Sequence, residues 1–228
     1  MQNQTNNQTP TATATQKYIS PLQEKPSSLF IPILLCVLIL LVFGFVLFTA
    51  LVGVVEVNQS SMNPALHHQQ LVLQNRNPRN IARLDVVTVS TPPHFQEQNI
   101  NLFIKRVVAT GGDRIKFRLE NPALGTGSIV HFYLMKYGTD IFVRQDHSSL
   151  INGEMRFGNH FNALRLSFTN GELIIPVPMG YMYLLGDNRN NSIDSRQYGP
   201  FSLSSINGRM FTALQRGSFT DRFFRVVF

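Results

Sequence analysis

The sequence predicts a mainly β protein: an antiparallel β-sheet or partly open barrel on a single N-terminal transmembrane helix, with an inserted β subdomain. Two observations support this fold class. No charged residue occurs from Leu29 to Val55, where Leu, Val, Ile and Phe dominate. After Val55 the apolar residues come in short runs between turn signals, and no stretch shows sustained helical periodicity. An antiparallel β domain attached to one membrane helix follows.

The N-terminal part divides into a tail over residues 1–27 and an anchor over residues 28–55. The tail is rich in Gln, Asn and Thr, a composition typical of disorder. The apolar run of about 27 residues is long enough to cross a hydrocarbon core of ~30 Å. A cleavable signal peptide is the alternative, but its apolar region usually has about 7–15 residues and ends at a small-residue cleavage site.

Charge and cysteine content limit where the remaining residues, 56–228, can work. Lys17 and Lys25 precede the apolar run, and no Lys or Arg follows it until Arg76. The positive-inside rule then places the tail in the cytoplasm and residues 56–228 outside it. The only cysteine, Cys36, lies in the apolar run, so no disulfide or thiolate metal site is expected beyond it. The net charge of +7 is explained by attraction to anionic phospholipid without invoking nucleic acid.

The β prediction depends on strand-like runs and on Asn-Gly pairs. Runs rich in Val, Leu and Ile predict strands over residues 70–74, 86–90 and 102–109. Asn and Gly tolerate positive φ, so three pairs predict hairpin turns, namely Asn152-Gly153, Asn170-Gly171 and Asn207-Gly208. The segment from about 119 to 171 is interpreted as an inserted β subdomain, to which we assign no function. The C-terminal segment 222–228 is basic and aromatic, and it is either a final strand or a membrane-surface contact.

Three islands of sequence beyond the anchor carry the candidate chemistry. The first is Ser61-Met62-Asn63-Pro64, preceded by a second serine, Ser60. The second is the run 103–108, which contains Lys105-Arg106 and is followed by Gly111-Gly112-Asp113. The third is the polar segment 186–196, which reads GDNRNNSIDSR.

Lys105 is flanked by apolar residues on both sides. In a strand it shares a face with Phe103 and Val107, so partial desolvation would lower its pKa. To be neutral at pH 7 its pKa must fall from about 10.4 to near 7, which only a buried site can achieve. A neutral lysine beside a serine hydroxyl is a competent general base. The alternative is an edge-strand lysine whose ammonium group reaches water.

The third island is too polar for a core strand and suits a loop whose side chains bond the backbone. Asp194 and Arg196 are close enough in sequence to form an ion pair, as are Asp187 and Arg189, and Ser192 is a plausible hydroxyl partner for an amine. Arginines among the potential ligands disfavour a metal loop. The six histidines lack metal-ligand spacing as well. We therefore expect no metal and no cofactor.

Taken in order, the three islands resemble the bacterial type I signal peptidases, the Ser–Lys serine proteases that remove signal peptides. The resemblance covers about residues 55–211 and includes the segment 177–181 before the last island. It implies that Ser61 is the nucleophile and that Lys105 is the general base. It also implies that the backbone N–H of Ser61 contributes to the oxyanion hole.

The same resemblance implies four supporting residues. Ser192 would orient the lysine, Asp194 and Arg196 would form an ion-paired support near the site, and Met62 would pack to hold the nucleophile turn. The chain departs from the family pattern at three places. Gln59 stands where some members carry a serine as a second oxyanion donor, Gln69-Gln70 stands where Gly-Asp is usual, and Gly111 replaces a proline.

The sequence thus predicts a membrane-anchored serine endopeptidase on the outer face of a bacterial cytoplasmic membrane. Its partners would be signal-peptide-bearing preproteins and the phospholipid membrane, with no nucleic acid. One alternative is a specialised maturation peptidase for a dedicated secretion or conjugation substrate. Another is an inactive membrane-anchored β domain that binds peptides. A self-cleaving repressor would need a DNA-binding domain, and the membrane run occupies that place.

Overall fold

The computed structural model describes residues 29–91, 101–124, 127–145, 155–158, 168–218 and 220–221. The predicted tail over residues 1–27 and the basic aromatic segment 222–228 lie outside the described residues, as does the Asn152-Gly153 pair. The chain divides after Phe43 into two compact units, and all the described strands belong to the second, residues 44–228.

Helix α1 (Phe30–Leu51) is long and apolar enough to cross a membrane, by length and composition, with a mean hydropathy of 3.2. It ends earlier than the predicted anchor, because Val52–Glu56 forms strand β1. The three valines of this segment favour extended backbone, and β1 pairs along its whole length with β2 (Leu71–Asn75). The helix therefore ends at Leu51, four residues before the predicted end of the anchor at Val55.

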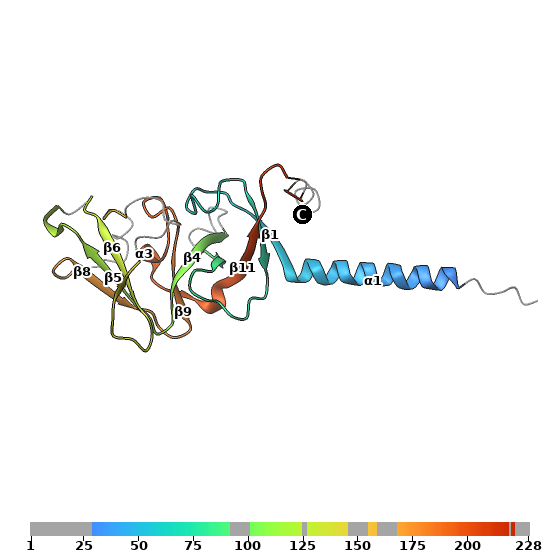
Figure 1. Ribbon diagram of the computed structural model, residues 1–228, viewed down its shortest axis with the longest axis horizontal. Helices are drawn as coiled ribbons and strands as arrows, with labels where there is room; N and C mark the ends of the chain where they lie inside the picture. Colours follow the sequence, from blue (N-terminus) through green and yellow to red (C-terminus); the bar gives the residue numbers. More distant parts are fainter. Residues whose placement is uncertain are drawn as a thin grey trace, which may run out of the picture. The chain divides into compact units, whose positions relative to one another are not determined.

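Seven antiparallel strands form the first sheet, in the order β1-β2-β11-β3-β4-β9-β10. Figure 1 labels four of them, β1, β11, β4 and β9. The strands not yet introduced are β3 (Val86–Ser90), β4 (Leu102–Thr110), β9 (Tyr181–Leu185), β10 (Phe201–Ser202) and β11 (Ile206–Ala213). The strands predicted over 70–74, 86–90 and 102–109 are confirmed to within one residue at each end. The sheet is curled and open, since β1 and β4 line one groove although three strands separate them in the order.

The second sheet has the strand order β7-β6-β5-β8. Its strands are β5 (Arg114–Leu119), β6 (Val130–Met135), β7 (Val143–Arg144) and β8 (Glu172–Pro176), with the 3-10 turn Pro122–Leu124 after β5. It lies in the chain between β4 and β9, so it is an insertion, but it begins before and ends after the predicted range of 119–171. Only a short turn separates β4 from β5, which is why no change in composition marks the start.

The two Asn-Gly pairs within the described residues have different roles. Asn170 and Gly171 have φ values of 51° and 77° and close the tip of a hairpin, as predicted. Asn207-Gly208 lies inside β11 instead, so that prediction is wrong. There the glycine allows close packing, since a Cβ on Gly208 would lie 2.5 Å from Cδ of Gln74.

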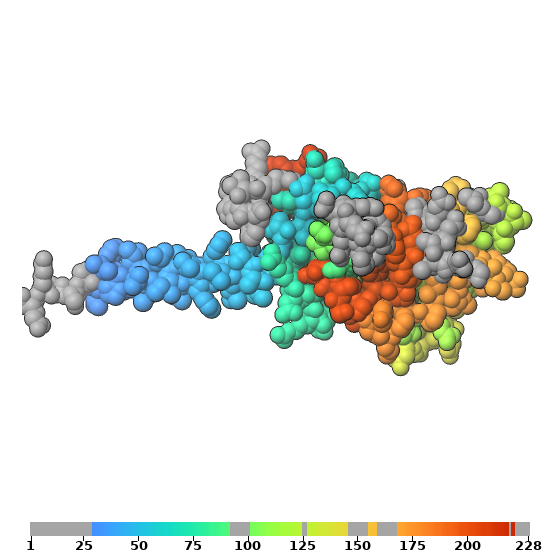
Figure 2. Space-filling view, turned by 180° about the vertical axis from the view of Figure 1, so that it is seen from behind, coloured from blue at the N-terminus to red at the C-terminus, as the bar shows by residue number. Residues whose placement is uncertain are grey.

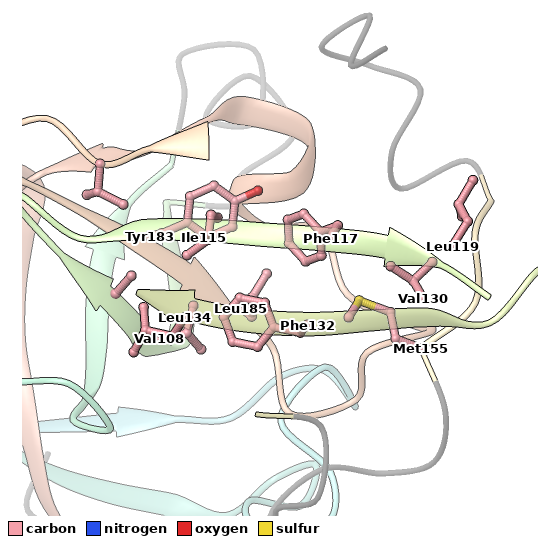
Figure 3. Packing of buried hydrophobic residues seen from close by; sticks show 12 residues of the cluster. Val108, Ile115, Phe117, Leu119, Val130, Phe132, Leu134, Met155, Tyr183 and Leu185 are labelled. Atoms are coloured by element: carbon pink, nitrogen blue, oxygen red, sulfur yellow. The ribbon is translucent and has the colours of Figure 1, made fainter. Parts of the chain in front are cut away.

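The largest apolar core lies against the inner face of the second sheet (Figure 3). Alternate residues of β5 and β6 point into it, and Phe117 and Phe132 stack at a centroid distance of 5.5 Å. Tyr183 of β9 belongs to the same cluster, which ties the second sheet to the first. Within the unit 44–228, β1 lies at one end and the second sheet at the other (Figures 1 and 2).

Candidate active site

Ser61 lies in a tight turn between β1 and β2. Asn63 N–H donates to the Ser60 carbonyl at 3.1 Å, and Leu66 N–H donates to the Met62 carbonyl at 2.9 Å. The Met62 side chain is buried in a cluster with Val57, Leu66, Val72 and Val86. Buried apolar side chains lie on both sides of Ser61, with Val57 before it and Met62 and Leu66 after it. They hold the turn, and with it Ser61, in a fixed place shortly after the end of β1.

Two asparagines of the third island also hold this turn. Asn188 donates its backbone N–H to the Ser61 carbonyl at 3.0 Å and its side-chain amide to the Ser60 carbonyl at 3.2 Å. Asn191 Nδ2 donates to Ser60 Oγ at 3.0 Å. From the sequence alone, these asparagines are expected only as loop residues. Their short side-chain amides, which bond backbone readily, were the one signal available.

Lys105 is carried into the same place by β4. Its Nζ donates a hydrogen bond to Ser61 Oγ at 2.8 Å and lies 5.1 Å from the centre of the Phe103 ring. The side chain is 2% exposed, so the alternative of an edge-strand lysine that reaches water is wrong. Alternation along β4 explains the placement, because Phe103, Lys105 and Val107 share the buried face.

Burial lowers the pKa of Lys105 from 10.5 to about 8. Three nearby charges modify this effect: Asp194 raises the pKa, Arg196 lowers it and Asp187 raises it. A substantial fraction of the molecules therefore carries a neutral amine near pH 8. Such an amine can accept the proton of the hydroxyl that it contacts.

Asp194 and Arg196 form a fully buried ion pair beside the site. Arg196 Nε and Nη2 donate to the two carboxylate oxygens at 2.9 and 2.8 Å. Asp194 also accepts from the backbone N–H of Gly186 at 3.1 Å and caps the short helix α3 (Ser195–Tyr198). Burial alone would raise the pKa of Asp194, but the charge and hydrogen bonds of Arg196, with smaller contributions from Gly186 and Lys105, hold it at about 2.

A second Asp–Arg pair, in which Asp187 is buried and Arg106 is partly exposed, joins β4 to the third island. Arg106 donates to Asp187 through Nε at 2.8 Å and through Nη2 at 2.7 Å. The predicted pairing of Asp187 with Arg189 is not found; instead the Arg189 carbonyl accepts from Arg196 Nη1. The register of the sheet explains the difference, since Arg106 lies opposite Leu185 and thus close to Asp187.

Gly186 and Ser192 lie between these charges and the nucleophile turn. A Cβ on Gly186 would lie 2.5 Å from the Ser61 carbonyl oxygen and 2.6 Å from Cβ of Ser192. Ser192 is buried, and its Oγ has no hydrogen-bond partner among the described residues. The structure thus places Ser192 next to the site, but no hydrogen bond joins its hydroxyl to Lys105 within the described part of the chain.

A groove of about 440 Å³ opens onto Ser61 and Lys105. Its other lining residues come from residues 54–59, from Met62 and from residues 101–104. Among the described strands, β1 pairs only with β2, and β9 begins to pair with β4 only at Arg106. Within the described part of the chain, no strand therefore lies on the groove side of β1 or of the first half of β4, and Gln59 lines the groove as well. In the described residues no group of His, Cys, Asp and Glu could hold a metal ion.

At Gly111, where the family has proline, a Cβ would lie 2.9 Å from Cα of Met179. The glycine therefore allows close backbone packing. The carboxylate of Asp113 braces this turn by accepting from the N–H groups of Thr110 and Tyr137 at 2.8 and 2.9 Å.

Comparisons with known proteins identify a family for this chain. A family model described as "Signal peptidase, peptidase S26" matches residues 30–214. Thylakoidal processing peptidase 1 of Arabidopsis thaliana is 29% identical over 55% of this chain, and signal peptidase I of Pseudomonas aeruginosa is 28% identical over 78% of it. The chain spans 30% and 64% of the lengths of these two relatives. A solved signal peptidase I from Enterococcus faecalis matches 60% of this chain and 100% of its own, with 19% identity and a TM-score of 0.35.

Proposed function

Since this chain belongs to the signal peptidase family, peptidase S26, we propose that it is a membrane-anchored serine endopeptidase that removes signal peptides from exported preproteins. The observation that carries the proposal is the buried contact between Lys105 Nζ and Ser61 Oγ at 2.8 Å. A lysine with a pKa of about 8 in contact with a serine hydroxyl can act as a general base at neutral to alkaline pH.

In the proposed mechanism, Ser61 Oγ attacks the carbonyl carbon of the scissile bond while neutral Lys105 takes the hydroxyl proton. The oxyanion of the tetrahedral intermediate accepts from the Ser61 backbone N–H, and the Gln59 side-chain amide is a candidate second donor because it lines the groove. The Lys105 ammonium then protonates the leaving amine. In the second half, Lys105 takes a proton from water, which attacks the acyl-enzyme and releases the signal peptide.

Four residues support this dyad in the proposal. The Asp194–Arg196 pair holds the two ends of the third island together, because Asp194 also accepts from the backbone N–H of Gly186, its first residue. Gly186 lies so close to the Ser61 carbonyl that there is no space for a side chain. Ser192 supplies a buried hydroxyl next to Gly186 that can orient the amine once the substrate is bound. Met62 holds the nucleophile turn through its apolar contacts. All four act through position, since none of them takes or gives a proton in the steps above.

The groove suits an extended peptide chain. A substrate strand can pair with the backbone groups of β1 and of the first half of β4, which gives affinity without depending on sequence. Val54, Val55 and Ile104 line the groove and provide apolar contacts for alternate side chains. This agrees with the family's preference for small residues at the first and third positions before the scissile bond.

We further propose that α1 anchors the enzyme in a bacterial cytoplasmic membrane with the site on the outer face. The length and composition of α1 support the anchoring, and Lys17 and Lys25 ahead of it support the orientation. The signal peptides of exported proteins reach the same face of the membrane. An anchored peptidase and its substrate therefore encounter each other by diffusion within the plane of the membrane rather than in solution.

The test is cleavage of a purified preprotein in detergent by the wild type, Ser61→Ala and Lys105→Ala. Both variants should lose about 10³-fold or more in rate, because each removes a member of the reacting pair. Ser204→Ala and Lys116→Ala, which change an exposed serine and a lysine of the second sheet, are the matched controls and should keep wild-type rates. Circular dichroism of each variant shows that it is folded.

The outcomes separate the alternatives. Persistent cleavage in Ser61→Ala or Lys105→Ala removes that residue from the mechanism. A folded wild type that is inert on generic preproteins but cleaves one co-secreted substrate identifies a dedicated maturation peptidase. A folded wild type that binds signal peptides without cleaving any of them identifies a peptide-binding domain and refutes the proposed activity.

A further inference from the structure

A second hollow lies at the end of β1 that is remote from the groove. It has a volume of about 390 Å³ and is lined by Leu51, Val52, Asn75, Asn77, Arg79 and Phe211. Three of these residues are apolar and three are polar. Leu51 and Phe211 are 47% and 56% exposed, so their side chains offer apolar surface here. This hollow, named the helix-end pocket here, takes no part in the proposed cleavage.

The depth of the helix-end pocket in the membrane follows from the length of α1. The 22 residues of the helix extend over about 33 Å at 1.5 Å per residue, close to the ~30 Å of a bilayer's hydrocarbon core. Leu51 is the last helical residue, so in the anchored enzyme it lies at the edge of the hydrocarbon core. Val52 and the residues packed on it then lie among the lipid headgroups, a layer of roughly 5–7 Å on each side.

The charge of this region is positive. Arg79 lines the helix-end pocket, and Arg76 lies beside it. The Arg76 backbone N–H donates to the Leu51 carbonyl at 2.9 Å, and its Nε is 3.0 Å from the position of a Cβ on Gly53. Among the described residues no acidic side chain lines the pocket. The nearby Asp85 carboxylate is paired with Arg209 at 3.6 Å.

The side-chain amides of Asn75 and Asn77 add neutral hydrogen-bond donors to the two arginines. The Asn75 side-chain oxygen accepts from the Asn77 backbone N–H at 2.8 Å, which leaves the Asn75 NH₂ group as a donor. A guanidinium and amide NH₂ groups next to Leu51, Val52 and Phe211 form an amphipathic site. Such a site matches a molecule with an anionic phosphate at one end and hydrocarbon at the other.

We propose that the helix-end pocket binds the headgroup of an anionic phospholipid of the surrounding membrane. Arg79 contacts the phosphate, the asparagine amides donate to its remaining oxygens, and Leu51 and Phe211 pack on the glycerol and the first acyl carbons. The inference rests on the membrane anchoring in the proposed function and goes beyond its chemistry. Because β1 joins this pocket at Val52 to the groove at Val54–Val57, a bound lipid fixes the depth of the strand that receives the substrate.

The experiment measures lipids retained by the full chain in native mass spectrometry. The protein in detergent is mixed with equal amounts of phosphatidylglycerol and phosphatidylcholine of the same acyl composition. The wild type should retain phosphatidylglycerol preferentially, and Arg79→Gln should lower the ratio of the two adducts about fivefold. The matched control is Arg118→Gln on the second sheet, where the arginine side chain is 58% exposed, and it should keep the wild-type ratio.

Four results would overturn the proposal. Three come from the comparison of the two lipids: equal retention by the wild type, an unchanged ratio in Arg79→Gln, and an equal fall in Arg118→Gln, which would indicate general attraction to a basic surface. The fourth comes from competition with phosphate. Excess inorganic phosphate should leave the lipid adduct in place, because the apolar contacts hold only a lipid. Displacement by phosphate would make the pocket a phosphate site and refute the lipid assignment.

The lipid measurement is independent of catalysis, so the two proposals fail separately. An enzyme that retains phosphatidylglycerol but cleaves no preprotein refutes the proposed function alone. An enzyme that cleaves preproteins but shows no lipid preference refutes the helix-end pocket alone. Ser61→Ala should retain lipid like the wild type, since Ser61 does not line this pocket.

Discussion

The two sheets of the unit 44–228 bury different kinds of side chain. On the four strands of the second sheet every buried residue is apolar (Figure 3), and the cations Lys116 and Arg118 alternate with the buried residues of β5. Beside the first sheet, Lys105 and the Asp194–Arg196 pair are buried, and so is Asp187, whose partner Arg106 has an 11% exposed side chain. Burying charge costs free energy that apolar packing does not. The difference indicates that the first sheet carries the chemistry and that the second carries stability.

Asp194→Asn should have the largest effect. The substitution leaves the Arg196 guanidinium buried without its counter-charge, so we expect a loss of about 3–5 kcal/mol in the free energy of unfolding. Cleavage should fall as well, because Gly186 and the turn around Ser61 lose their support. Thermal unfolding in detergent and a cleavage assay below the melting temperature measure the two effects.

A double variant separates stability from chemistry in this pair. Asp194→Leu combined with Arg196→Met removes both charges and should recover most of the lost stability, as buried pairs replaced by apolar residues often do. Cleavage should stay low, since no carboxylate then bonds the Gly186 N–H beside the turn that holds Ser61. If cleavage recovered together with stability, the buried charges would be structural only, and the contrast between the sheets would fail.

The pH dependence of cleavage should reveal the buried lysine. Burial lowers the pKa of Lys105 to about 8, and only the neutral amine can act as the base. The rate should therefore rise with pH and reach its plateau above about 8. At pH 6 it should be about a hundredfold lower, since the neutral fraction falls tenfold for each pH unit below the pKa. Initial rates of kcat/KM from pH 5.5 to 10 on a substrate without groups that titrate there provide the measurement.

The same lysine should make stability depend on pH. Between pH 8 and 10.5 the unfolded chain binds more protons than the folded one, so the free energy of unfolding rises with pH over this window. Lys105→Met should remove that rise. A rate profile that is flat from pH 6 to 9 would mean that Lys105 is not the base.

The sequence was most informative about elements whose structure is determined locally by residue type. The apolar run and the short Val-rich runs predict α1 and three strands, because burial and β propensity act locally. The order of the islands brought Ser61, Lys105, Asp194 and Arg196 to attention. Their contact distances could not be predicted, since they depend on how β4 and the third island are positioned by the rest of the sheet.

The errors have the same origin. Arg106 and Asp187 are 81 residues apart in the chain, and only the register of β4 against β9 brings them together. Proximity in sequence indicates only that Asp187 and Arg189 are close enough to help build an ion-paired network. Asn207-Gly208 has the composition of a turn, but Gly208 serves close packing on Gln74. The end of α1 was placed too late because valine is equally apolar in a helix and in β1.

Phe117→Leu tests the second sheet. Phe117 is fully buried and contacts the Phe132 and Tyr183 rings at centroid distances of 5.5 and 6.2 Å. The smaller side chain should lower the free energy of unfolding by about 1–3 kcal/mol. At temperatures where the variant is folded, kcat/KM should equal the wild-type value, because no reacting group moves. A tenfold fall in kcat/KM of the folded variant would assign the second sheet a part in the chemistry.

The smallest effect is expected for Arg118→Gln, and the comparison with Arg196→Gln makes it informative. Both substitutions remove an arginine that pairs with a carboxylate. The Arg118 guanidinium lies 3.7 Å from Glu172, and its side chain is 58% exposed, so water already solvates both charges. Stability should change by less than about 0.5 kcal/mol.

Arg196 is fully buried and bidentate, so its loss leaves Asp194 without a partner and should lower stability about as much as Asp194→Asn. If both arginine variants were equally mild, water would reach the pair beside the active site, and the low dielectric environment needed to lower the Lys105 pKa would not exist. The same substitution in the two sheets thus measures how well the first sheet excludes water from its charges.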